Sequence, residues 1–258
     1  MTLDAQASDI SSLPSLVSDL LDRGDPSNIA LISPEGPILT YHSLKCQVES
    51  LAGQLNSFGI GRGDRVAIVL PNGVENIVSF LAVTASGATA APLNPAYTRE
   101  EFVFCLEDVH SKAVITSSSV SDAIKEAIPE QTIDVRVGIN SAGKIRFLNR
   151  NKNGFPVMKE QIGSEDIALV LHTSGTTCRP KLVPISHRNL MNGAKNVAET
   201  YDLGHEDVSL CVMPLFHIHG LVASTLATIF SGGVVVVPSK FNALDFWSIV
   251  EALSLIHI

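Results

Sequence analysis

The loop from His172 to Lys181 combines hydroxyl groups, one glycine and two cations, and it has no carboxylate. Its hydroxyl and glycine positions are Thr173, Ser174, Gly175, Thr176 and Thr177. Glycine lets backbone N–H groups turn toward a ligand, hydroxyls add donors, and Lys181 supplies a mobile positive charge, so the set suits the phosphate oxygens of a polyanion. The loop is not a Walker A motif, because Pro180 stands where that motif has glycine. On composition alone, a solvated surface turn remains an open alternative.

A second candidate group lies in the stretch Met213–Gly220, which contains His217 and His219. An imidazole can donate a hydrogen bond to an anion, which makes His217 a candidate catalytic residue. The alternative is a core histidine at the end of a strand. The His-x-His spacing of the two residues is half of a metal site, but no third ligand accompanies it, so we predict no metal ligands.

Three elements must position these groups. Ile167–Leu171 is a short, continuous apolar run, which is the pattern of a strand buried on both faces of a sheet, and the hydroxyl-rich loop follows it directly. Ser186 is predicted to cap a helix over residues 187–201. A strand over residues 208–213 then delivers the stretch with the two histidines.

The preceding part of the chain alternates between strand-like and helix-like segments, which indicates the parallel βαβ units of an α/β fold. Residues 129–164 are polar, which predicts a seam or surface excursion. A last helix is predicted over residues 244–253. The other predicted strands are 29–32, 38–40, 66–70, 88–91 and 113–116, and the other predicted helices are 13–21, a helix from Tyr41 that ends before Gly59, 74–85, 100–108 and 120–128.

Composition places the chain among globular proteins, because 258 residues with 45% hydrophobic residues can bury a substantial core. The net charge of −8, with dispersed Lys and Arg, argues against binding to nucleic acid or to an anionic membrane surface.

The uncharged segment 218–238 is long enough to cross a bilayer, but Gly232-Gly233 divide it into a helix and a strand, so we predict no membrane span. Four separated cysteines and the absence of a signal segment favour a cytoplasmic location.

Three stretches together resemble the adenylate-forming superfamily, which includes acyl-CoA synthetases, luciferases and the adenylation domains of peptide synthetases. They are Thr173–Lys181, Ala90–Tyr97 and Met213–Gly220, and they follow the order and spacing of the family. Within the family, the combination of His172–Thr177, Arg179–Lys181 and Phe216–Leu221 looks most like the plant and fungal oxalate:CoA ligases, relatives of the 4-coumarate:CoA ligases. The resemblance implies the layered βαβ sheets of the large N-terminal domain of these enzymes.

The resemblance also implies a two-step reaction on a small carboxylic acid such as oxalate, with ATP, Mg²⁺ and coenzyme A. The carboxylate attacks the α-phosphate of ATP to give an acyl-adenylate and pyrophosphate, and the thiol of coenzyme A then displaces AMP. By resemblance, Thr173–Thr177 hold the β- and γ-phosphates beside Lys181, and His217 lies near the acyl group. Leu182 stands where the family has glycine, and we expect its side chain to crowd the backbone after the lysine.

The family's later elements have no counterpart after Leu253. They include a Mg²⁺-binding glutamate, a ribose-binding aspartate and a C-terminal domain whose lysine drives adenylation. We therefore expect residues 11–253 to be an incomplete N-terminal domain, with subregions at about 11–160 and 161–253, and residues 254–258 to be a non-native end.

The expected function is that of an acid:CoA ligase fragment with little or no turnover. One alternative is a non-catalytic short isoform that binds a nucleotide or a partner. Another is an unrelated α/β protein whose loop matches by chance. The alternative location is the peroxisome, if the missing C-terminus carries a signal.

Overall fold

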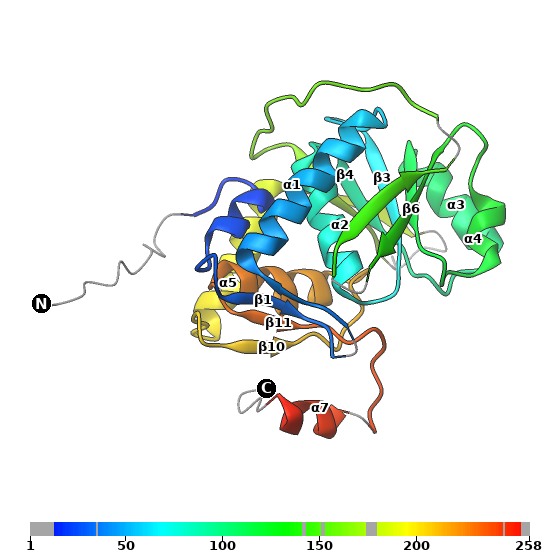
Figure 1. Ribbon diagram of the computed structural model, residues 1–258. Coiled ribbons are helices and arrows are strands. Elements are labelled where there is room, and N and C mark those ends of the chain that lie inside the picture. Colours follow the sequence, from blue (N-terminus) through cyan, green and yellow to red (C-terminus); the bar gives the residue numbers. More distant parts are fainter. Residues whose placement is uncertain are drawn as a thin grey trace, which may run out of the picture.

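The computed structural model describes residues 13–34, 36–140, 143–150, 153–173, 180–244 and 246–253, which form an α/β fold around two sheets (Figure 1). One sheet has seven strands and the other has four. Helices pack against both sheets. The predicted α/β class with layered sheets is therefore confirmed.

The seven-stranded sheet has the strand order β7-β6-β5-β3-β4-β8-β9. β3, β4, β5, β6 and β8 pair in parallel, whereas β7 and β9 run antiparallel at the two edges. The five parallel strands therefore have their carboxyl ends at one edge of the sheet. The strands are β3 (Arg65–Val69), β4 (Thr89–Pro92), β5 (Ala113–Thr116), β6 (Ile133–Ile139), β7 (Ile145–Asn149), β8 (Ile167–Thr173) and β9 (Lys181–Ser186).

The four-stranded sheet has the order β10-β11-β1-β2 and joins strands from distant parts of the chain. β1 (Ile29–Ile32) pairs antiparallel with β2 (Ile38–Thr40) and parallel with β11 (Val234–Val236), which in turn pairs with β10 (Val208–Leu210). Each sheet thus contains strands from both sides of residue 160. The subdivision of the domain at that residue stays a prediction.

The helices cover both faces of the larger sheet. Successive residues of β3 point to opposite faces of the sheet. Val66 and Ile68 belong to a core shared with α1 and α2, and Ala67 and Val69 belong to a second core shared with α3 and α4, as expected for a buried parallel strand. The helices are η1 (Val17–Asp22), α1 (Tyr41–Ser57), α2 (Val74–Ala85), α3 (Arg99–Val109), α4 (Asp122–Ala127), α5 (His187–Thr200), η2 (His219–Leu226), α6 (Ala227–Phe230) and α7 (Phe246–Ala252).

The longest helix, α1, also closes an edge of the larger sheet. It begins after Thr40, whose side chain accepts a hydrogen bond from the backbone N–H of Ser43. The Oε1 atoms of Gln47 and Gln54 accept hydrogen bonds from the N–H groups of Ile145 and Phe147 in the edge strand β7, at 2.8 and 3.1 Å. Backbone donors that would otherwise lack a strand partner are satisfied in this way.

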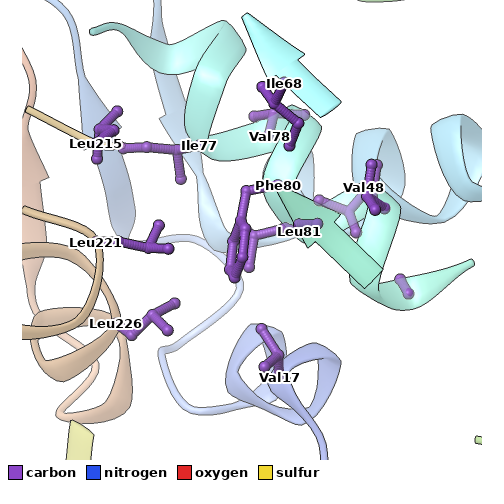
Figure 2. Close-up of a cluster of buried hydrophobic side chains, with 14 of the residues drawn as sticks. Val17, Val48, Ile68, Ile77, Val78, Phe80, Leu81, Leu215, Leu221 and Leu226 are labelled. Atoms are coloured by element: carbon purple, nitrogen blue, oxygen red, sulfur yellow. The ribbon is translucent and has the colours of Figure 1, made fainter. Parts of the chain in front are cut away.

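One continuous core connects the two sheets. Figure 2 shows Phe80 of α2 between Val17 of η1 and Leu221 and Leu226 of η2. Each of these four side chains is at most 1% exposed. Complete burial of a large apolar side chain stabilises a fold by about 1.5–3 kcal/mol, so this cluster holds η1, α2 and η2 together as one body.

The structure corrects the prediction for residues 129–164, which contain β6 and β7. In β6 the buried residues Ile133, Val135 and Val137 alternate with polar or small ones, and this period of two is the pattern of a half-buried strand. The longest described stretch of that region without a helix or strand is residues 153–164. The prediction also missed β9, where Pro184 lies in an edge strand, a place that tolerates a missing N–H.

Other predicted elements agree with the structure within a few residues. The segment 218–238 divides as predicted into η2 and α6 before Gly232 and β11 after Gly233. Across the described residues, no helix combines the length and apolar character that a membrane crossing requires. The helix predicted over residues 13–21 is the 3₁₀ helix η1. The last helix, α7, has no buried residue.

A buried histidine ties the N-terminal helix to the fold. His187, the first residue of α5, is 2% exposed, and its Nδ1 accepts a hydrogen bond from the backbone N–H of Val17 at 3.1 Å. Burial lowers the pKa of His187 from its ordinary value of 6.5, while Asp166 and Asp19 oppose the shift. The neutral imidazole is therefore the form that the folded chain favours.

We predict that part of the pH dependence of stability comes from His187. Its pKa is lower in the folded state, so the stabilisation is present above about pH 6.5 and is lost as the pH falls, because the unfolded state takes up the proton first. Urea unfolding at about pH 7.5 and about pH 5 measures this, and His187→Gln should lose less stability between them than the wild type. His205→Gln, at a side chain 74% exposed, is the control and should behave as the wild type. An identical loss in all three proteins would contradict the prediction.

Candidate functional site

The predicted loop is carried by a β-hairpin at the carboxyl edge of the larger sheet. β8 lies between β4 and β9, and its residues Ala168–Leu171 are buried. The last register pair of the hairpin is Thr173 with Lys181, and Thr173 Oγ1 donates a hydrogen bond to the Lys181 carbonyl at 3.4 Å. Both residues are exposed. The structure thus brings together the two ends of the loop.

Four predicted site residues lie between these ends and outside the described residues. They are Ser174, Gly175, Thr176 and Thr177. Their role in phosphate binding stays a prediction, whereas the structure places Thr173 at the end of the core strand β8 and Lys181 opposite it at the start of the edge strand β9.

Leu182 has a different environment from the one expected. It lies in β9 opposite His172, and its half-buried side chain packs against a cluster of Ala91, Val109 and Val170. Positive φ at non-glycine residues occurs, within the described part of the chain, at His110 and Asp202. The backbone after the lysine is an ordinary strand, so a branched side chain fits here without strain.

His217 lies on a loop between β10 and η2, and a residue that follows β3 of the larger sheet holds this loop by two hydrogen bonds. Asn72, just after β3, donates to the Met213 carbonyl at 3.0 Å and accepts from the Leu215 N–H at 2.9 Å. These two bonds clamp the turn that precedes His217. The His217 side chain is exposed, with the Phe216 ring 4.6 Å away between ring centroids. His217 is therefore a surface group on a fixed turn, and the alternative of a core histidine is wrong.

The segment after His217 is a π-helix that begins at His219. A Cβ atom on Gly220 would lie 2.5 Å from the Pro214 carbonyl oxygen, so only glycine permits this approach. The Thr225 hydroxyl donates to the Gly220 carbonyl at 2.9 Å. π-Helical turns are rare and are frequent at functional sites, and this one fixes the base of the histidine loop.

A cavity of about 830 Å³ opens at the carboxyl ends of β3, β5 and β6. Hydroxyl and amide groups dominate its polar lining, and Glu75 is the charged residue among the described side chains around it. The cavity thus suits uncharged hydrogen-bonding groups, whereas Lys181 brings a positive charge to the same edge of the sheet. The hydroxyl and amide residues are Ser33, Asn72, Ser117, Ser118, Ser119, Asn140 and Ser239.

The thiols differ in accessibility. Cys105 and Cys211 are buried and free, and burial raises the pKa of each thiol to about 11, which makes them poor nucleophiles. Cys46 is exposed. Cys178 lies outside the described residues. Within the described part of the chain, no three His, Cys, Asp or Glu side chains gather into a group that could hold a metal ion.

These features define an α/β protein that has its candidate ligand site at the carboxyl ends of parallel strands. Residues 22–257 match the model of the family described as AMP-binding enzyme, and the chain belongs to that family. The resemblance to adenylate-forming enzymes is thereby confirmed.

Among related proteins, the chain is 41% identical to the oxalate–CoA ligase of Arabidopsis thaliana over 216 residues, which cover 81% of this chain and 42% of that protein. It is 38% identical to the oxalate–CoA ligase of Saccharomyces cerevisiae over 255 residues, which cover 85% of this chain and 46% of that protein. The chain spans less than half the length of these curated relatives.

Solved structures show the same relation. The crystal structure of ATP-bound MatB from Rhodopseudomonas palustris superimposes with a TM-score of 0.78 at 27% sequence identity. The match covers 92% of this chain and 48% of MatB. The described fold is thus the fold of about half of such a protein.

Two residues of the site escaped prediction from the sequence. Asn72 follows the predicted strand 66–70 at its carboxyl end, and a polar residue in that place is a signal that could have marked it. Asp108, which contacts His172 at 2.9 Å, lies on a helix 64 positions away, and no sequence pattern connects the two.

We predict that Asn72→Ala loosens the turn that carries His217. The substitution removes one donor and one acceptor, each worth about 0.5–1.5 kcal/mol, so the backbone N–H groups of residues 213 and 215–217 should exchange with solvent about tenfold faster. Hydrogen exchange followed by mass spectrometry measures this. The exposed Asn192→Ala on α5 is the control, and its exchange in residues 213–217 should equal that of the wild type. Unchanged exchange in Asn72→Ala would show that the turn is held by other contacts.

Proposed function

We propose that the chain is the nucleotide-binding portion of an acid–CoA ligase. The observation that carries the proposal is the β8–β9 hairpin, which puts Thr173 and Lys181 side by side at the carboxyl edge of a parallel sheet in a member of the AMP-binding family. The curated relatives are named as CoA ligases, and the similar crystal structure of MatB has ATP bound.

The reaction joins two anions and therefore requires positive charge and hydrogen-bond donors at the triphosphate. A carboxylate oxygen attacks the α-phosphorus of ATP, and the bond to the bridging oxygen breaks, which gives acyl-adenylate and pyrophosphate. The sulfur of coenzyme A then attacks the acyl carbon, and AMP leaves. Thioester formation thus consumes one carboxylate, one ATP and one thiol.

In this proposal, the residues Thr173–Thr177 surround the β- and γ-phosphates and Lys181 neutralises their charge. His217, exposed on its clamped turn, donates a hydrogen bond to the developing charge at the acyl group. Mg²⁺ accompanies ATP as a family requirement. Within the described part of the chain, no group of three His, Cys, Asp or Glu side chains could hold a metal ion, and the hydroxyl and Lys181 groups would act as donors to the phosphates.

Oxalate, or another small carboxylate, is the proposed acid, because both oxalate–CoA ligases are similar to the chain over most of its length. A cytoplasmic location and the absence of nucleic-acid partners remain part of the proposal. The net charge of −8 with dispersed cations supports the latter.

We predict little or no turnover by residues 1–258 alone. Incubation with ATP, Mg²⁺, oxalate and coenzyme A should release no more pyrophosphate than a blank, because the family's adenylation lysine has no counterpart among these residues. Full-length Arabidopsis oxalate–CoA ligase is the positive control for the assay. Robust release by the chain would refute the proposal that it is an incomplete domain.

The second candidate function is that of a non-catalytic nucleotide-binding protein, for which the hairpin tip with Thr173 and Lys181 would suffice. We predict that ATP binds and that Lys181→Ala weakens ATP binding about tenfold to a hundredfold, because a hydrogen bond to a charged group contributes about 1.5–3 kcal/mol. Titration calorimetry gives both dissociation constants. Lys159→Ala, at another exposed lysine, should leave affinity unchanged. If the wild type does not bind ATP, the proposal of a nucleotide-binding protein is wrong and the chain is an inert fragment.

A further inference from the structure

A histidine–carboxylate pair lies directly behind the hairpin tip. His172 precedes Thr173 in β8, and its Nε2 lies 2.9 Å from Asp108 Oδ2 in α3. The His172 side chain is 7% exposed and the Asp108 side chain is 40% exposed. Phe104, one turn earlier on α3, packs against the imidazole with ring centroids 6.1 Å apart. Helix α3 thus holds the imidazole through two of its side chains.

Asp108 occupies a place that an isolated helix disfavours for a carboxylate. α3 ends at Val109, so Asp108 lies in the last turn, where the backbone carbonyls carry partial negative charge. No basic residue accompanies it in that turn of the described helix. At the end of this helix, Arg65 Nη1 donates to the Val109 carbonyl at 3.0 Å, and His172 Nε2 lies 2.9 Å from the Asp108 carboxylate.

The pairing of β8 with β4 is short, so side-chain contacts add to the attachment of β8 on that side. The register between the two strands consists of Ala90 with Leu169. At the amino end, Arg62 donates to both carboxylate oxygens of Asp166 at 2.9 Å. At the carboxyl end, His172 and Asp108 form the corresponding side-chain contact, one residue before Thr173.

We propose that Asp108 and His172 are positioning residues for the nucleotide loop. The inference rests on the proposed function of that loop. Asp108 fixes the ring orientation of His172, and His172 fixes the end of β8, so that Thr173 and Lys181 keep their register across the loop. In this proposal neither residue contacts the nucleotide. Their loss weakens binding of the β- and γ-phosphates, because these are the groups that the loop contacts.

The first test needs no ligand. Hydrogen exchange of residues 171–173 and 181–183 is compared in the wild type and in Asp108→Asn, which keeps the size of the side chain and removes its charge. We expect exchange about tenfold faster at these residues alone, because a charge-assisted hydrogen bond is weakened. Glu107→Gln makes the same charge change at the exposed neighbour and should not alter exchange. Unchanged exchange at the hairpin in Asp108→Asn overturns the inference.

The second test separates positioning from general stability. ATP and AMP are titrated into the wild type, Asp108→Asn, His172→Gln and the double variant. We expect each single variant to raise the dissociation constant for ATP about tenfold with little change for AMP, and the double variant to add nothing further. A merely structural role would change the affinity for both nucleotides equally, or for neither, and would overturn the inference.

The two tests also keep the inference apart from the proposed function. If the wild type binds no ATP, the proposed function fails, and the exchange experiment still decides whether the pair holds the hairpin. If ATP binds and Asp108→Asn behaves as Glu107→Gln in both tests, the inference fails and the proposed function stands.

Discussion

The parallel pairing of β3, β4, β5, β6 and β8 is the constraint on which the rest of the structure depends. Helices α1 and α2 cover one face of the central strand β3 and α3 and α4 cover the other, so neither face of this strand is open to a ligand. Polar chemistry is thereby confined to the loops at the ends of the strands. The carboxyl edge carries the hairpin tip, the polar cavity and the clamp at Asn72, and all three exist because the strands run in the same direction.

A second constraint is the coupling of the two sheets. β1 pairs with β11, about 200 positions later in the chain, and Phe80 packs between η1 and η2. The turn before His217 is also tied to the larger sheet, because Asn72, three residues after β3, forms two hydrogen bonds with it. Groups from sequence regions far apart share one rigid frame, which is the preorganisation that charge-stabilising sites need.

The sequence predicted what local patterns determine, and it failed where tertiary contacts decide. The apolar runs of β3, β5 and β8, the helix α2 and the cap at Ser186 were read correctly, because burial on both faces and capping leave a local signal. β6 alternates with a period of two and could have been recognised. β9 contains Pro184 and few buried residues, and only its pairing with β8 makes it a strand. The same holds for Asp108, whose role depends on a contact across 64 positions.

Leu182 shows how such a contact changes the meaning of a residue. Judged against the family pattern, a branched side chain after the lysine suggests crowding. In the structure, β9 is extended at this position, and Leu182 packs on Ala91, Val109 and Val170 directly opposite His172. Just below its tip, the hairpin therefore has an apolar anchor on β9, which packs on Val109 of α3, and a polar tether on β8, which reaches Asp108 of α3. A glycine would lose the first of these, so at this hairpin the departure from the family strengthens the support beneath the loop instead of disturbing it.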